Sequence, residues 1–174
     1  KALAIKPDSA DTYNSMGVTL KGQGKLEEAI AAHKKALVIK PDSAEANHMV
    51  SSLTGKTTNV APREYVENLF DGYANKFDQS LVGKLAYDIP QVLTQLAVQK
   101  QGNSSLGSII DLGCGTGLTG VKIREYCSYL EGIDLSSKML SLAKTKNVYN
   151  KLCHVDIVEY LSNVELDFDY FIST

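Results

Sequence analysis

The sequence has 174 residues, enough for one domain of ordinary size or for a domain and a small module. Hydrophobic residues make up 44% and charged residues 22%, values typical of globular proteins, and the formal net charge of -2 does not indicate a nucleic-acid-binding surface. No apolar run approaches the roughly 20 residues that span a bilayer, and we see no signal peptide, so we expect a cytoplasmic protein without a membrane partner.

The first 54 residues contain an internal repeat. KALAIKPDSA at 1–10 returns as KALVIKPDSA at 35–44, an offset of 34 residues with nine of ten positions identical. That period is typical of the tetratricopeptide repeat, a helix–turn–helix unit. We expect helices at about 10–20 and 26–37, with Gly17 small where the second helix approaches and with His33 as a partly buried spacer.

The segments on either side of this unit resemble incomplete repeats of the same tetratricopeptide family. Residues 1–7 resemble the end of an earlier unit, and residues 42–54 resemble the first helix of a later one. Such repeats need neighbours to bury their faces, so either more repeats precede Lys1 or the module packs on the segment after residue 54. Residues 1–54 are therefore either a partner-binding or dimerising surface or a packing appendage.

A linker is predicted at 55–61, and Pro62 opens a helical segment. Apolar residues recur there at helical spacing until Asp88-Ile89-Pro90 interrupts the pattern, and a second helix comes next at about 90–100. The aromatic residues of this segment support two interpretations. It is either an amphipathic helix that covers a sheet or a lid that lays Tyr73 or Phe77 over a bound ligand.

From residue 109 onward, apolar runs alternate with helical patterns. Strands are predicted at 109–112, 129–133, 151–156 and 168–174, with Leu118 and Val121 on the inner face of the helix after the first strand and Ser136 as the cap of the next helix. This alternation predicts an α/β fold with a parallel sheet. Ligands of such sheets bind beyond the carboxyl ends of the strands.

The first two strand ends carry glycines and acids. Gly113, Gly115 and Gly117 come after the first strand, where the chain turns sharply and lets a ligand approach without a Cβ in the way. Asp134 ends the second strand and can accept both hydroxyls of a ribose, which fits NAD(P) as well as S-adenosylmethionine. Asp111 favours S-adenosylmethionine, because a carboxylate repels a diphosphate and attracts an ammonium and a sulfonium.

The third strand end supplies the expected adenine contacts. Asp156 can accept from the adenine amino group, and the backbone N–H of Ile157 can donate to a ring nitrogen. Leu135 and Met139 are apolar residues that we expect against the adenine faces. Together with the first two strand ends, these residues form a predicted site for every part of the cofactor.

Three motifs resemble, in order and spacing, the first three cofactor motifs of the class I S-adenosylmethionine-dependent methyltransferases. They are DLGCGTG, which includes Cys114, GIDLSSKMLSLA and HVDIVEYL. With the repeats, most of the chain resembles the tetratricopeptide-containing methyltransferases. The resemblance implies a Rossmann-like domain over 62–174, S-adenosylmethionine as cofactor and an unknown methyl acceptor. The alternatives are a non-catalytic scaffold that acts through its repeats and an NAD(P)-binding domain.

The resemblance also implies a seven-stranded sheet, whereas this sequence stops at Thr174 in the fourth strand. We therefore expect a fragment of a longer protein, without an identifiable catalytic base, whose fourth strand is an exposed edge covered by dimer contacts. Three cysteines, Cys114, Cys127 and Cys153, show no C-x-x-C spacing and predict free thiols in a reducing compartment. The three histidines lack metal-ligand spacing, so no metal site is predicted.

Overall fold

The computed structural model describes residues 9–56, 60–102, 104–163, 165 and 167–174. The chain divides into two compact units, Lys1–Val66 and Glu67–Thr174. The expected remnant of an earlier repeat at 1–7 and the middle of the expected linker lie outside the described residues. Within the described residues, no helix combines the length and the apolar character of a membrane span.

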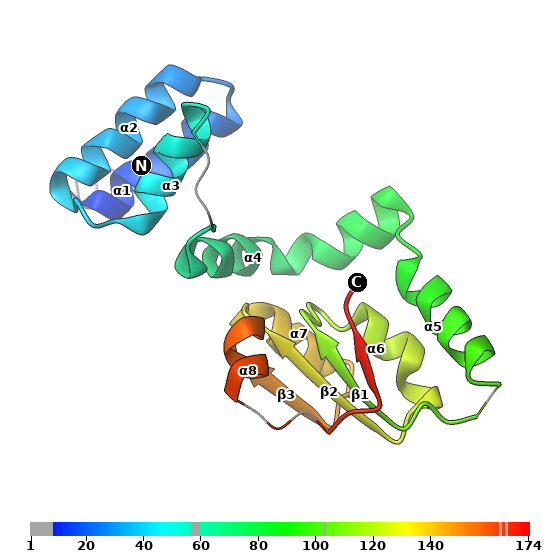
Figure 1. Ribbon diagram of the computed structural model, residues 1–174. Helices are drawn as coiled ribbons and strands as arrows, with labels where there is room; N and C mark the ends of the chain where they lie inside the picture. Colours follow the sequence, from blue (N-terminus) through cyan, green and yellow to red (C-terminus); the bar gives the residue numbers. More distant parts are fainter. Residues whose placement is uncertain (1–8, 57–59, 103, 164, 166) are drawn as a thin grey trace. The chain divides into compact units, whose positions relative to one another are not determined.

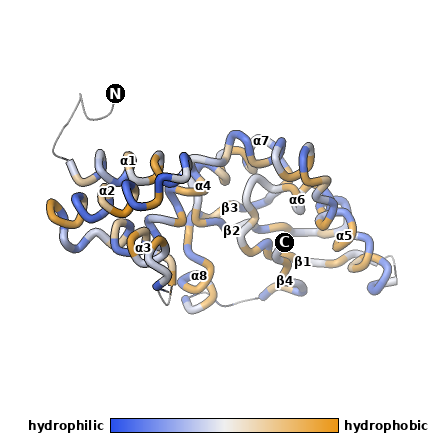
Figure 2. Tube along the Cα trace, turned by 90° about the horizontal axis from the view of Figure 1, so that it is seen from above, coloured by the Kyte–Doolittle hydropathy of each residue, from blue (hydrophilic) through white to orange (hydrophobic). Residues whose placement is uncertain are grey.

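The first unit contains a helix–turn–helix pair and then a further helix. Its helices are α1 (Ala10–Gly22), α2 (Leu26–Ile39) and α3 (Ala44–Leu53) (Figure 1). Hydrophilic and hydrophobic residues alternate around the turns of α1 and α2 (Figure 2), and small residues dominate two core clusters, whose buried members are Ala10, Leu20, Ala29, Ala32, Ala36 and Ala46. The predicted repeat helices are confirmed, each about two residues longer than expected.

The contact between α1 and α2 is closest at Gly17. A Cβ on Gly17 would overlap the imidazole of His33, so the expectation of a small residue there is confirmed. His33 is 0% exposed, whereas the sequence predicted partial burial. Its Nδ1 lies 3.1 Å from the Oδ1 of Asn14, and its Nε2 is buried without a partner among the described residues. Burial, with a smaller effect from the charge of Lys21, lowers the pKa of His33.

A long helical segment connects to the second unit. Helix α4 (Arg63–Asp78) continues into a π-helical stretch, η2 (Gln79–Lys84), and α5 (Ile89–Lys100) begins after a break. Pro90 lies in the first turn of α5, where its missing N–H has no helical partner to lose. The interruption predicted at 88–90 is confirmed. The π-helical stretch was not predicted, because its hydrogen-bond pattern leaves no local signal in the sequence.

The second unit is built on a four-stranded parallel sheet with the order β3-β2-β1-β4. The strands are β1 (Ser108–Leu112), β2 (Tyr129–Asp134), β3 (Lys151–His154) and β4 (Tyr170–Ile172). Helices α6 (Leu118–Ile123) and α7 (Ser137–Thr145) cover one face, and α8 (Ile157–Asn163) covers the other (Figure 1). The predicted α/β fold is confirmed, and the strand order reverses between β1 and β4, where such folds bind ligands.

Each face of the sheet has its own core. Ile109, Leu130 and Ile172 pack with Ile123 on the side of α6, and the other core contains Ile110, Ile133 and Tyr160. Burial on both faces is characteristic of parallel sheets. The sheet is therefore covered by apolar side chains on both sides, as the predicted α/β fold requires.

The inner face of α6 differs from the prediction. Val121, expected to face the sheet, is 46% exposed, and Ile123 takes the inward position at 1% exposure. The buried face of α6 consists of Thr119, Gly120 and Ile123, because Gly120 lets the ring of Tyr149 pack against the helix there. Helix α6 ends at Ile123 and continues into the 3-10 turn η3 (Arg124–Tyr126).

The third strand is shorter than predicted. It ends at His154 and not at Asp156. Asp156 instead lies before α8, where its Oδ1 accepts hydrogen bonds from the backbone N–H groups of Val158 at 2.8 Å and Glu159 at 3.2 Å. N–H groups in the first turn of a helix have no partner within the helix, and a carboxylate before the helix can accept from them. Asp156 therefore caps α8 and does not extend β3.

Candidate functional site

The glycines after β1 adopt the backbone that the sequence predicted for them. Gly113, Gly115 and Gly117 have φ values of 73°, 52° and 84°, in the left-handed region that favours glycine. The N–H groups of Gly113 and Cys114 both donate to the carbonyl of Ile133 at 2.9 Å. The loop is therefore fixed to the end of β2 before α6 begins.

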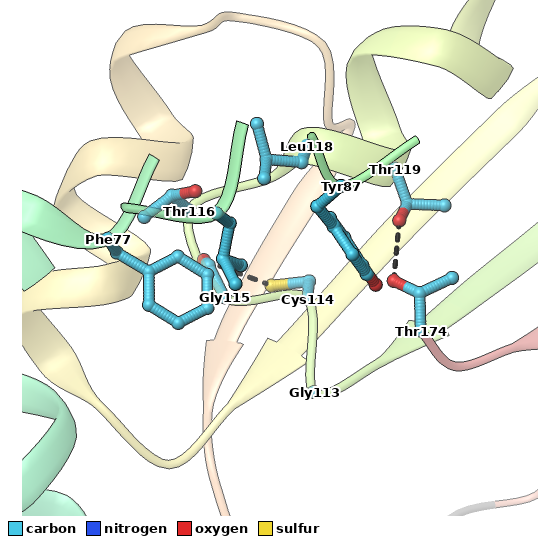
Figure 3. A pocket seen from close by; sticks show the side chains of 10 residues that line it. Phe77, Tyr87, Gly113, Cys114, Gly115, Thr116, Leu118, Thr119 and Thr174 are labelled. Atoms are coloured by element: carbon cyan, nitrogen blue, oxygen red, sulfur yellow. Dashed lines mark hydrogen bonds between the residues drawn. The ribbon is translucent and has the colours of Figure 1, made fainter. Parts of the chain in front are cut away.

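A pocket opens onto this loop (Figure 3). Its walls come from three parts of the second unit: the loop, the start of α6 with the end of the chain, and the segment from α4 to α5. The residues are Gly113, Cys114, Gly115, Thr116, Leu118, Thr119, Thr174, Phe77, Leu81 and Tyr87. The floor is thus the glycine backbone, and aromatic side chains form the cover.

The two proposed lid residues differ in position. Phe77 lines the pocket, and its Cε1 would lie 3.8 Å from a Cβ built on Gly115. Tyr73 is 39% exposed and contacts the edge of the Phe77 ring, with the ring centroids 5.8 Å apart. Phe77 is therefore the residue that covers the loop, and Tyr73 supports it from outside the pocket lining.

Asp111 lies on β1, one residue before the strand ends. Its side chain is 1% exposed, and its Oδ2 accepts a hydrogen bond from the hydroxyl of Tyr149 at 2.7 Å. Burial raises the pKa of Asp111 to about 6, the nearby Asp134 adds to the increase, and the bond from Tyr149 opposes it. Across the described ranges, the structure gives the other oxygen, Oδ1, no donor.

Asp134 ends β2 and joins two elements. Its Oδ2 accepts from the N–H of Gly115 at 2.8 Å, and its Oδ1 accepts from the N–H of Ser136 at 2.7 Å. Burial raises the pKa of Asp134, although these backbone hydrogen bonds oppose the increase. Ser136 caps α7 by accepting from the N–H of Met139 at 3.1 Å, as predicted. The carboxylate thus holds the glycine loop beside the start of α7.

Of the predicted cofactor residues, Gly113, Cys114, Gly115 and Phe77 line the pocket, whereas the others, Asp111 and Asp134 included, lie outside its lining. Leu135 is half-buried, and its carbonyl lies 2.7 Å from the Nε2 of His154. Met139 is 1% exposed inside the packed face of α7. Ile157 packs against the core of Ile110 and Ile133. The structure therefore brings Asp111, the loop and Asp134 together, while the predicted adenine contacts are engaged in packing or in capping α8.

Sequence reasoning missed two acids of α4 that reach the same region. Asp71 accepts from the Ser136 hydroxyl at 2.5 Å and from the N–H of Lys138 at 3.2 Å. These bonds lower the pKa of Asp71 against the opposing effect of burial. Asp78 accepts from the hydroxyl of Thr116 and pairs with the Nζ of Lys146 at 2.8 Å. The two acids are two helical turns apart, a spacing that places them on one face of α4, but their partners lie in distant segments of the sequence.

Comparison with known proteins finds a match in each unit. Residues 109–174 match the family model of the methyltransferase domain, and residues 10–43 match that of the tetratricopeptide repeat. A protein of Geobacillus sp. (strain WCH70) whose name proposes a methyltransferase is 31% identical over 77 residues, which are 44% of this chain and 31% of that protein. A similarly named protein of Bacillus subtilis (strain 168) is 32% identical over 78 residues, 45% of this chain and 29% of that protein. The match thus spans about a third of the length of these relatives.

Solved structures show the same fold. A complex of DhpI with SAM and HEP superposes with a TM-score of 0.52 at 17% identity, over 67% of this chain and 52% of that one. The magnesium protoporphyrin IX methyltransferase of Synechocystis PCC 6803 with bound SAM gives 0.51 at 15% identity, over 67% of this chain and 64% of that one. The second unit therefore has the Rossmann-like methyltransferase fold that the sequence predicted.

Proposed function

We propose that this protein is an S-adenosylmethionine-dependent methyltransferase that binds its cofactor at the glycine loop of the second unit. One observation carries the proposal: the buried carboxylate of Asp111, whose Oδ1 accepts no hydrogen bond from the described residues, lies two residues before a loop of three glycines in the left-handed region. The relatives that match this part of the chain, and the SAM-bound structures that share its fold, support the same activity.

The charges around the loop fit this cofactor better than a dinucleotide. Asp134 at the end of β2 fits either cofactor, whereas the carboxylate of Asp111 on β1 would repel a diphosphate. S-adenosylmethionine carries an ammonium and a sulfonium and no phosphate. We assign its ammonium to Asp111 Oδ1, because Oδ2 already accepts from Tyr149.

Asp134 fits the ribose. Both of its oxygens accept backbone N–H groups, yet each carboxylate oxygen has more than one lone pair. Ribose hydroxyls can therefore donate to Asp134 while those bonds hold the loop. The assignment of Leu135, Met139, Asp156 and Ile157 to the adenine end stays a prediction, and it requires side-chain rearrangement at Met139, which is 1% exposed.

Bound S-adenosylmethionine would supply a methyl carbon made electrophilic by the sulfonium. The residues of this chain would hold and enclose it: the loop backbone through close approach, Asp111 and Asp134 through hydrogen bonds, and Phe77 and Tyr87 by excluding water from the pocket. Asp71 and Asp78 would keep α4 over the loop as a lid. The methyl acceptor is unassigned.

The remaining assignments are coarser. We assign the tetratricopeptide helices to protein interaction, on the match over residues 10–43 and on the apolar side chains that they expose, Val18 and Val38 among them. We assign the protein to the cytoplasm, because the three cysteines are free thiols, as a reducing compartment favours.

Calorimetry with S-adenosylhomocysteine tests the proposal. We expect binding that Asp134→Ala weakens at least tenfold. Asp169→Ala is the matched control, because Asp169 also accepts backbone and hydroxyl hydrogen bonds, from Ser108 at the opposite end of β1. Binding of NADH in place of S-adenosylhomocysteine would identify a dinucleotide domain. The absence of binding to either ligand would favour the second candidate, a non-catalytic scaffold that acts through its repeats.

A further inference from the structure

Tyr149 lies in the segment between α7 and β3, and its side chain contacts Asp111 and Gly117. Its hydroxyl donates to Asp111 Oδ2 at 2.7 Å. Burial raises the pKa of Tyr149, and the charge of Asp111 raises it further, so the phenol keeps its proton and remains a donor. None of the sequence motifs contains this residue.

Three glycines from three different elements surround the Tyr149 ring. A Cβ on Gly117, at the end of the loop, would lie 2.9 Å from Cε2, and a Cβ on Gly132, in β2, would lie 2.8 Å from Cε1. A Cβ on Gly120, in α6, would overlap the end of the ring and the hydroxyl. The three glycines therefore leave space for the planar ring of Tyr149 but not for a side chain of their own. This packing fixes the position of the ring and of its hydroxyl.

We propose that Tyr149 is a positioning residue for cofactor binding, which holds Asp111 through Oδ2 and leaves Oδ1 to accept from the ammonium of the cofactor. The inference rests on the proposed function. It explains why the glycines extend beyond the loop itself: Gly120 and Gly132 line the slot of the ring and do not line the pocket.

The charge of Asp111 depends on this contact. The titratable groups that face it are Tyr149, Asp134 from β2 and Cys114 from the loop. Burial and Asp134 favour the protonated carboxyl, and burial also keeps the Cys114 thiol neutral by raising its pKa. Tyr149 is the group among them that favours the carboxylate. Without its hydroxyl, the pKa of Asp111 rises above about 6, and a protonated Asp111 cannot attract an ammonium.

The test is the affinity for S-adenosylhomocysteine, measured by calorimetry from about pH 5.5 to about pH 8.5. Wild-type affinity should fall below about pH 6. Tyr149→Phe keeps the ring and removes the hydroxyl, so its affinity should fall at a higher pH, with a roughly tenfold loss at about pH 7 that recovers by about pH 8.5. Tyr160→Phe is the matched control: Tyr160 donates to the buried Glu131 at 2.6 Å on the other core of the sheet, and its profile should equal that of the wild type.

Two results for Tyr149→Phe would overturn the positioning role: an affinity equal to wild type at every pH, or one lowered by the same factor at every pH. If Tyr149→Phe does not fold, 3-fluorotyrosine at position 149, a stronger donor, should move the midpoint to lower pH, and an unchanged midpoint would overturn the role. Wild-type protein that binds no S-adenosylhomocysteine at any pH would instead refute the proposed function, on which this inference depends.

Discussion

Both units of the chain bury ionisable side chains, and His33 and Asp111 are two of them in different settings. His33 in the first unit is 0% exposed and Asp111 in the second is 1% exposed. Burial favours the neutral form of both, lowering the pKa of His33 and raising that of Asp111. Each has one hydrogen-bond partner, Asn14 or Tyr149. The perturbed pKa values therefore do not distinguish a structural residue from a site residue.

The surroundings of the two side chains do distinguish them. His33 lies between two helices that close upon it, and Gly17 leaves room for its ring alone. Asp111 lies near the carboxyl end of β1, where the strand order reverses and a pocket opens onto the adjoining loop. A perturbed pKa indicates a functional site when the fold also gives a ligand access to it.

The largest expected effect is on the packing of the first unit. Gly17→Val would drive two methyl groups into the His33 ring, and we expect it to lower the free energy of unfolding by about 3 kcal/mol, the upper end for overpacked cores. Denaturant unfolding measured by circular dichroism tests this. Gly22→Ala is the control, because nothing lies within 4 Å of its Cβ position. Equal stability of the Gly17→Val and Gly22→Ala variants would show that the helices do not close on His33.

Next in size is the glycine slot of the second unit. Gly117→Ala combines a φ of 84° with a contact to Tyr149, and we expect a loss of about 2 kcal/mol together with weakened binding of S-adenosylhomocysteine. Gly24→Ala shares the backbone strain, with φ 77°, and has nothing within 4 Å. The difference between the two variants measures the contact with Tyr149 at 2.9 Å together with a looser one to the Cβ of Ala143 at 3.4 Å. Identical losses, with binding unchanged, would contradict it.

Acidification should change the contributions of His33 and Asp111 to the free energy of unfolding in opposite directions. In the unfolded chain, His33 takes up a proton near its ordinary pKa of 6.5, whereas in the folded protein burial keeps it neutral to a lower pH. The His33 contribution therefore lowers the free energy of unfolding as the pH falls. The stabilising contribution of Asp111 is fully present below pH 3.8 and is lost as the pH rises through about 6. Acidification from neutral pH therefore raises the free energy of unfolding through Asp111. We expect the contribution of Asp111 to change by about 1 kcal/mol between about pH 7.5 and about pH 5.5, and that of His33 to change in the opposite direction.

Variants separate these two contributions. The unfolding free energy of His33→Leu minus that of the wild type should rise as the pH falls, and the corresponding difference for Asp111→Asn should fall. Both are measured by denaturant titration at the two pH values. Differences that change in the same direction would show that the two groups are not buried as described.

The smallest expected effect is at the lid. Asp78 pairs with Lys146, but their side chains are 43% and 22% exposed, so Asp78→Asn should cost about 0.5 kcal/mol and lose this effect in about 1 M salt. The control is Asp88→Asn, an exposed acid at the start of α5. Thermal unfolding at low salt and at about 1 M salt measures the stability of both variants. A large, salt-independent loss for Asp78→Asn would contradict a weak, solvent-screened ion pair with Lys146.

Local patterns were enough to predict much of the molecule. The offset between the two KPDSA segments predicted the repeat helices, and the alternation after residue 109 predicted the sheet. The glycine loop and Asp134 were identifiable because each follows the apolar pattern of a strand directly. Asp156 was misplaced because a strand end and a helix cap both favour an acid, and a single sequence does not say where β3 stops.

The missed residues depend on contacts between distant segments. Tyr149 and Asp111 are 38 positions apart, and Asp71 and Ser136 are 65 apart. No periodicity connects such pairs. In the sequence, Gly120 and Gly132 are ordinary helix and strand positions, and only the structure shows that they pack against the ring of Tyr149. The shell that holds the site could therefore not be derived from the sequence, although the loop at its centre could.

A crystal structure of the protein grown with S-adenosylhomocysteine tests the central claim most directly. We predict that the ligand lies at the carboxyl ends of β1 and β2, with its amino group within hydrogen-bond distance of Asp111 Oδ1 while Tyr149 remains on Oδ2. A ligand bound away from the glycine loop, or one whose amino group contacts neither oxygen of Asp111 directly or through water, would contradict the claim.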